Sequence, residues 1–185
     1  QFYFELVTQY NRTFADKHEL GGLLVFTRNE SLNTLGGNDF ATLPSRNMGV
    51  SGRATYAYDG RYFTELNFGY NGSEKFAENH RFGYFPSAGL GWVVSNEKFF
   101  AGVSHIFSLL KFKVTYGLVG NDAISNPNDR FFYLSDVNLT DWNRGYTFGR
   151  DFGNSYSGYY INRYSNPDVT WEVAEKANYG IEMGL

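Results

Sequence analysis

The residues best suited to chemistry lie in one polar stretch, residues 121–166, where aromatic side chains are interspersed with carboxylates, amides and arginines. Aromatic faces fit the C–H faces of sugar rings, and planar polar groups fit their hydroxyl edges. A stretch of this length without regular alternation predicts a functional loop. The same aromatics can instead pack the loop against itself. The candidate ligand-binding residues are Trp142, Tyr146, Arg144, Arg150, Tyr159 and Tyr160.

Catalytic and metal-binding arrangements find little support. The sequence holds three histidines, His18, His80 and His105. They are far apart and lack the spacing of metal ligands, and no predicted strand places a serine and a histidine on one face. Asn126, Asn128 and Asp129 offer oxygen ligands for calcium, although a solvated turn is the simpler interpretation. We therefore expect no enzyme activity, no catalytic residue, no metal and no cofactor.

Most of the chain alternates apolar and polar residues with a period of two, which is typical of strands with two different faces. The stretch 81–100, RFGYFPSAGLGWVVSNEKFF, shows this most clearly. One parity holds Pro86, Leu90 and Trp92, whereas the other holds small residues such as Ser87 and Gly89. Similar runs occur near residues 2–11, 18–29, 47–58, 62–71, 110–118 and 169–183. The sequence therefore predicts about seven strands.

Short and long connections alternate between these strands, as in transmembrane barrels. Ala15-Asp16-Lys17 and Asp59-Gly60 predict tight turns, and a further turn is expected around residues 96–108. The long connections are residues 31–45, 72–80 and 121–166. Pro86 cannot donate to a strand ladder, so it should mark a bulge or the outer end of its strand.

Composition restricts the class of protein. The 185 residues suffice for one domain, and the net charge of -3 gives no footprint for nucleic acid or for a polybasic membrane anchor. Cysteine is absent, which excludes disulfides, thiolate zinc sites and thiol nucleophiles. Aromatic residues make 19% of the chain, more than a soluble domain ordinarily needs. The first 14 residues predict a strand rather than a signal peptide.

Two all-β architectures fit these observations. A soluble sandwich buries branched aliphatic residues between two sheets, whereas a transmembrane barrel carries aromatic girdles on its lipid-facing side. Tyrosine and tryptophan gather near strand ends on the apolar parity, and Lys, Arg, Glu and Asn occupy the other parity. This pattern favours an antiparallel barrel wall. A soluble carbohydrate-binding β-sandwich module is the alternative.

Residues 52–62, GRATYAYDGRY, resemble the repeated hairpin motif GR-x-x-Y-x-Y-x-x-RY of SusC/RagA-type TonB-dependent outer-membrane transporters. Each motif is weak alone, but their order and spacing are specific. Asn71 and Lys75 stand where the family often has Asp and Arg. The similarity continues through GSEKF at 72–76, RFGYFPS at 81–87, GW at 91–92, EKFF at 97–100, LKFKVTYG at 110–117, GN at 120–121 and NPDVTWE at 166–172.

The resemblance implies a barrel of 22 strands with a plug in its lumen. Residues 1–185 are then part of the barrel domain, a wall segment of about seven strands, and the plug and the amino-terminal coupling region are expected to lie outside them. Trp92 should lie near the periplasmic girdle. Short turns would be periplasmic and long loops extracellular. The lumen-lining candidates, which could equally anchor the plug, are Arg53, Glu65, Lys111 and Lys113.

The resemblance also implies a function. It is active import of oligosaccharides or peptides across the outer membrane of a Bacteroidota-type bacterium, energised by TonB, ExbB and ExbD through regions outside this chain. The implied partners are a SusD-like surface lipoprotein, against which the loop aromatics could pack, the transported substrate and outer-membrane lipids, with no nucleic acid. The chain would be a multi-pass part of an outer-membrane barrel, supplying wall and ligand-facing loops.

Overall fold

The computed structural model describes residues 1–32, 43–103, 107–123 and 131–184. Short 3-10 turns cover Glu78–His80 (η1), Val94–Asn96 (η2) and Lys98–Val103 (η3). No helix among the described residues is long and apolar enough to cross a membrane. The strands are β1 Phe2–Phe14, β2 His18–Ser31, β3 Ser45–Tyr58, β4 Tyr62–Ser73, β5 Phe82–Val93, β6 Leu109–Asn121, β7 Asp136–Phe148, β8 Asn154–Arg163 and β9 Glu172–Gly184.

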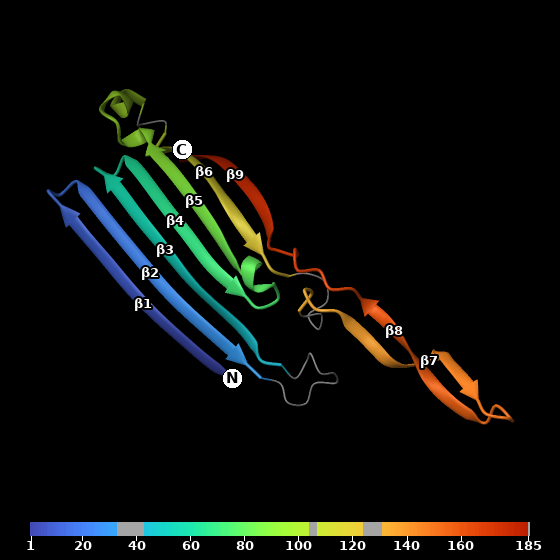
Figure 1. Cartoon of the computed structure of the whole chain (residues 1–185). Helices are drawn as coiled ribbons and strands as arrows, with labels where there is room; N and C mark the ends of the chain where they lie inside the picture. Colours follow the sequence, from blue (N-terminus) through green and yellow to red (C-terminus); the bar gives the residue numbers. More distant parts are fainter. Residues whose placement is uncertain (33–42, 104–106, 124–130, 185) are drawn as a thin grey trace.

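Seven strands form one antiparallel sheet in the order β1-β2-β3-β4-β5-β6-β9, and β7 and β8 form a separate two-stranded ribbon, the arm. The arm projects beyond one end of the sheet, which we call the arm end (Figure 1). The opposite end, the turn end, holds the β1–β2 and β3–β4 turns. In these turns Ala15, Asp16, Asp59 and Gly60 all have positive φ, the backbone of type I′ hairpins. The sheet of seven strands and both tight turns confirm the sequence prediction.

The arm corrects the expectation that residues 121–166 form a loop, because β7 and β8 lie within this stretch. Both faces of the ribbon are largely exposed, so no buried face imposes alternation on its sequence. Register shifts between β7 and β8 break the period of two further. The described residues therefore form nine strands, and the arm accounts for the excess over the predicted seven.

Strand register sorts the sheet into two faces of different chemistry. Leu66 pairs with Ala54 on one side and with Ala88 on the other, and Ala88 pairs in turn with Tyr116. Paired residues share a face, so this row defines an apolar face across the sheet. The alternate positions form the polar face, with Arg53 opposite Asn67. Parity in the sequence thus predicted the faces correctly.

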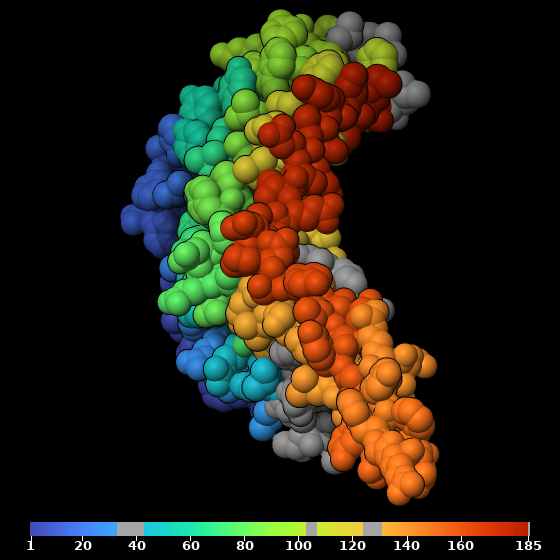
Figure 2. Space-filling view, turned by 45° about the vertical axis from the view of Figure 1, so that its right-hand side comes forward, coloured from blue at the N-terminus to red at the C-terminus, as the bar shows by residue number. Residues whose placement is uncertain are grey.

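The apolar face has no second layer over it. The side chains of Leu66 and Tyr179 are 55% and 83% exposed, and many other large apolar residues on this face are comparably open. Among the described residues, the buried apolar side chains are few and lie mostly at the sheet ends: Ala57, Phe76, Val93, Val94, Phe100 and Phe131. The space-filling view shows a single curved wall rather than two packed sheets (Figure 2). The alternative of a soluble sandwich is therefore wrong.

An aromatic row crosses the apolar face near the turn end. The rings of Tyr62 and Trp92 are nearly parallel, 8° apart in plane, with centroids 6.5 Å apart. Tyr58 lies 6.4 Å from Tyr62, and His18 lies 4.9 Å from Tyr58. Phe112 continues the row 6.5 Å beyond Trp92. These contacts place Trp92 in an aromatic row at the end of the sheet that holds the short turns.

A second aromatic group, the upper row, lies on the same face toward the arm end. Tyr70 and Phe82 stack with centroids 5.1 Å apart, and Phe68 contacts Tyr84. On β4, the separation between Tyr62 and Tyr70 along the strand is about 27 Å, at a rise of roughly 3.4 Å per residue. A strand tilt of about 40° reduces this separation to about 21 Å of height, close to the roughly 25 Å apolar band of membrane barrels.

Pro86 marks the place where β5 and β6 separate. The β5–β6 ladder runs from Val93 only as far as Ser87, whereas β5 continues its pairing with β4 to Phe82. Pro86 therefore lies inside β5, and the strand stops pairing on one side only. The missing donor explains why the ladder ends there.

Candidate functional site

An aromatic cluster fills the gap between β5 and β6 and holds the base of the arm. Phe76 is fully buried, with its ring 5.4 Å from that of Trp171. Phe85 also contacts Trp171, edge to face, with ring centroids 5.2 Å apart. Its ring covers Gly120, where a Cβ atom would overlap it. We call Phe76, Phe85, Gly120 and Trp171 the hub.

Hydrogen bonds tie the hub to the end of β6. Ser73 Oγ donates to Asp122 Oδ2 at 2.8 Å, and Lys75 Nζ donates to the Asp122 carbonyl oxygen at 2.9 Å. Trp171 Nε1 donates to the carbonyl oxygen of Arg81 at 3.2 Å. Ser73, Lys75, Arg81 and Trp171 all belong to the motifs singled out in the sequence. Their shared role is to lock the β4–β5 connection against the two chain segments that lead to and from the arm.

Glycine allows the two strands of the arm to approach closely. A Cβ atom at Gly158 would overlap the carbonyl oxygen of Arg144, and one at Gly145 would lie 2.6 Å from the carbonyl oxygen of Tyr156. Both contacts lie where the β7–β8 register shifts. The shifts re-aim the side chains of β7 relative to those of β8.

The structure brings together two of the six candidate ligand-binding residues. The Arg144 guanidinium lies over the Tyr160 ring at 3.9 Å from its centroid, and Arg144 Nε is 3.7 Å from Asp141 Oδ2. Trp142 and Tyr159 are each 68% exposed. The planar guanidinium of Arg144, fixed over the Tyr160 ring, can bind a planar polar group such as a carboxylate.

The remaining candidates lie nearer the tip of the arm. Tyr146 packs 5.2 Å from Phe148, and Phe148 packs 5.8 Å from Tyr156. Arg150 lies in the turn between β7 and β8. Phe148 and Tyr156, which are not among the six candidates, join Tyr146 in this group because Tyr146 pairs with Tyr156.

The four lumen-lining candidates lie on the polar face in two groups. Arg53 Nε donates to Asn67 Oδ1 at 3.1 Å and lies 3.5 Å from Glu65 Oε1. Lys111 and Lys113 both pair with Glu182 of β9. The prediction missed Asn67 and Glu182, although their parity places them on this face.

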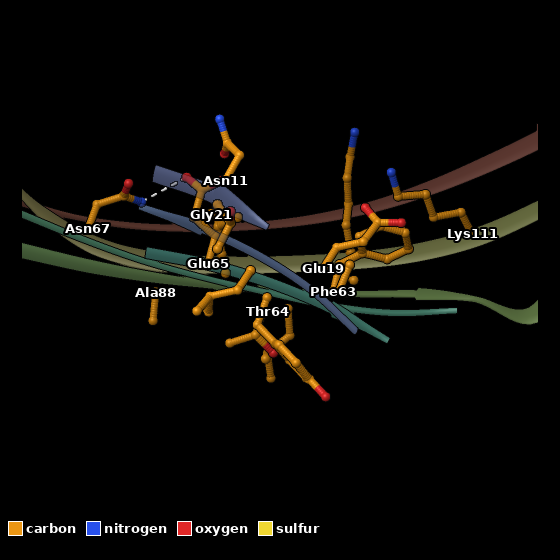
Figure 3. A pocket seen from close by; sticks show the side chains of 18 of the residues that line it. Asn11, Glu19, Gly21, Phe63, Thr64, Glu65, Asn67, Ala88 and Lys111 are labelled. Carbon is orange, nitrogen blue, oxygen red and sulfur yellow. Dashed lines mark hydrogen bonds between the residues drawn. The ribbon is translucent and has the colours of Figure 1, made fainter. Parts of the chain in front are cut away.

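A hollow of about 520 Å³ lies over the polar face between these groups. Gly21, Gly89 and Gly91 contribute no side chains to its lining, which keeps that part of the wall shallow. Asn11 and Lys111 point to one side of the strands, whereas Ala88 points to the other (Figure 3). On the polar face, the hollow is lined by amides and by charges of both signs, together with the ring of Phe63.

Metal-ligating groups do not gather in the described ranges, where no three His, Asp or Glu side chains are placed to hold an ion. His105 and the calcium candidates Asn126, Asn128 and Asp129 lie outside those ranges.

Comparisons with known proteins identify similar chains. The sequence is 29% identical to TonB-dependent receptor P39 of Formosa agariphila over 95% of this chain and 18% of that protein. It is 30% identical to TonB-dependent receptor SusC of Bacteroides thetaiotaomicron over 76% of this chain and 14% of SusC. No family model matches the chain.

Solved structures agree in fold. The RagAB peptide importer in its closed-closed state matches with a TM-score of 0.72 at 21% identity, covering 98% of this chain and 21% of that chain. Its open-open state gives 0.68 at 23% identity. This chain thus spans about a fifth or less of the proteins that it matches. By their names, these proteins are receptors and importers.

Proposed function

Because this chain belongs to the SusC/RagA-type TonB-dependent receptors, we propose that it forms a section of barrel wall in an importer of the outer membrane. The observation that carries the proposal is the single-layered sheet. Its apolar face is open between two aromatic rows, and its opposite face is polar. Lipid on one side and water on the other satisfy both faces, whereas water on both sides would leave a large apolar surface exposed.

The edges of the sheet support a place within a larger barrel. The edge strands β1 and β9 each pair with one neighbour among the described residues. Closure of a barrel removes such edges, so further strands of the same receptor would pair with them. In this proposal the plug and the region that contacts TonB, and through it ExbB and ExbD, belong to other parts of the receptor.

Orientation follows from the lengths of the connections. Membrane barrels have short periplasmic turns and longer extracellular loops, so the turn end would face the periplasm and the arm end the cell exterior. The polar face would line the lumen, with Arg53, Glu65, Lys111 and Lys113 along the route or against the plug. The arm would then stand at the extracellular mouth.

The arm is the proposed contact for substrate and for a SusD-like lipoprotein. A two-stranded ribbon is marginally stable alone, so its exposed aromatics favour a partner or a ligand over them. The substrates proposed are oligosaccharides or peptides. Stacking on Trp142 and Tyr159 suits sugar rings, and the Arg144–Tyr160 pair suits carboxylate or amide groups.

Transport by the full receptor tests this function. Cells that express the full receptor with its lipoprotein should accumulate labelled oligosaccharide or peptide, and a protonophore should abolish accumulation, because the transport is energised. The double variant Trp142→Ala/Tyr159→Ala should raise the half-saturating substrate concentration, whereas Phe99→Ala on an exposed turn should not. Accumulation that persists with the protonophore, or without the receptor, contradicts the proposal.

A further inference from the structure

The apolar face becomes cationic immediately beyond the upper aromatic row. Arg28 and Arg46 lie near the arm ends of β2 and β3, and both side chains are more than half exposed. Glu30 lies between them, 3.6 Å from Arg28 and 3.2 Å from Arg46. Arg28 pairs with Met48 in the strand register, so these charges share the face of the apolar residues.

A groove of about 650 Å³ runs beside these arginines. A third arginine, Arg81, lines it, and Arg81 Nε is buried without a hydrogen-bond partner among the described residues. The remaining walls include the carboxylate of Glu74 and apolar side chains, Met48 and Phe82 among them. Phe82 is the same ring that stacks on Tyr70 in the upper row. The groove is therefore charged at one end and continuous with the apolar face at the other.

The chemistry of the groove matches a phosphate group. Each guanidinium has five N–H donors in a planar fork. Arg28 and Arg46 each approach Glu30 through the Nη2 nitrogen. Arginine binds phosphate oxygens in pairs, more strongly than neutral donors do.

The height of the groove matches a membrane surface. On β2, Arg28 lies about 34 Å along the strand from His18, which belongs to the aromatic row near the turn end. This distance is about 26 Å of height at a tilt near 40°. This height equals the apolar thickness of a barrel, so the arginines lie where lipid phosphates lie. Acyl chains attached to such a phosphate would extend along the apolar face.

We propose that Arg28, Arg46 and Arg81 bind the phosphorylated headgroup of an outer-leaflet membrane lipid, with its acyl chains against Met48, Phe82 and the upper aromatic row. The orientation rests on the proposed function, but the binding does not require transport. The occupant is a lipid rather than free phosphate, because the groove opens onto the apolar face rather than onto the polar wall.

Native mass spectrometry of the full receptor in detergent, titrated with bisphosphorylated lipid A, tests the proposal. The double variant Arg28→Gln/Arg46→Gln should weaken binding on the order of 30-fold, given the attraction of each near-surface arginine for anionic lipid. Lipid A without phosphates should bind the native receptor as weakly as bisphosphorylated lipid A binds the variant. Equal binding of both lipids, or of native and variant receptor, overturns the proposal.

Matched controls separate binding from structure. Arg53→Gln, on the opposite face of β3, should leave lipid binding unchanged. Glu30→Gln should leave it unchanged or strengthen it, because a competing carboxylate is removed. Weaker binding by Glu30→Gln would assign the cluster a structural role and overturn the proposal. Displacement of lipid A by excess inorganic phosphate would overturn the choice of lipid. Normal substrate uptake by the double variant separates this test from that of the proposed function.

Discussion

Glu97 shows how one carboxylate organises the turn end. Its Oε1 accepts a hydrogen bond from Tyr62 OH at 2.6 Å and another from Trp92 Nε1 at 3.1 Å, both from the aromatic row. Its Oε2 accepts from Arg61 at 3.0 Å. The bonds from Tyr62 and Trp92, together with the charge of Arg61, lower the pKa of Glu97. A single residue therefore links two membrane-facing rings to the β3–β4 turn.

This arrangement predicts a dependence of stability on pH. Because folding lowers the pKa of Glu97, its contribution is complete above the ordinary glutamate value of about 4.3 and is lost as the pH falls through the lower folded value. Thermal unfolding of the full receptor in detergent, between neutral and strongly acidic pH, should show this loss. Glu97→Gln should lower the melting temperature at neutral pH and reduce its acid dependence. Glu78→Gln, at an exposed position, should do neither. Equal acid dependence of native and Glu97→Gln receptor would contradict the linkage.

At the scale of elements, the hub connects three chain segments through one buried ring. Phe76→Ala should destabilise the hub by about 3–5 kcal/mol, which is the cost expected for loss of a buried phenylalanine side chain. Hydrogen exchange of the full receptor should then accelerate at residues 73–83 and 120–123. Phe99 is 70% exposed, so Phe99→Ala should change stability by less than about 0.5 kcal/mol. Unchanged exchange in Phe76→Ala would show that the hub does not hold these segments.

The arm offers a test of its backbone packing. Gly158→Ala should separate β7 from β8, because the new methyl group would overlap the Arg144 carbonyl. We expect faster amide exchange along both strands and loss of the Arg144–Tyr160 contact. Gly153→Ala, near the tip, meets no atom within 4 Å and serves as the matched control. If both variants exchange alike, the close approach at Gly158 does not stabilise the arm.

The contrast between sheet and arm explains what the sequence could predict. In the sheet, each strand must turn a consistent parity toward each face, so sequence alternation predicts that Leu66 and Arg53 lie on opposite sides. In the arm, pairing depends on register shifts at Gly145 and Gly158, which leave no periodic signal. The sequence therefore indicated which aromatic residues are candidates for ligand binding. It did not indicate that Arg144 meets Tyr160 or that Tyr146 meets Phe148.

At the scale of the whole molecule, the apolar face determines where the sheet is stable. Leu66 lies between the two aromatic rows, so Leu66→Lys would place a charge near the middle of the apolar band. This should cost about 2–4 kcal/mol of folding free energy in a bilayer. Ser51→Lys, exposed on the polar face of β3, should cost little. Urea unfolding of the full receptor in lipid vesicles measures both. Equal costs would mean that the apolar face does not meet lipid.

The pairing of β6 with β9 has a consequence for the order of assembly. Every other neighbouring pair in the sheet is consecutive in sequence, so each such hairpin can form by local collision. The pairing of Asn121 with Glu172, by contrast, closes a long loop of intervening chain. Closing a long loop costs more conformational entropy, so this pairing has a larger entropic barrier. β9 should therefore be the last of the seven strands to join. Until it does, the free edge of β6 remains open to pairing with the wrong strand.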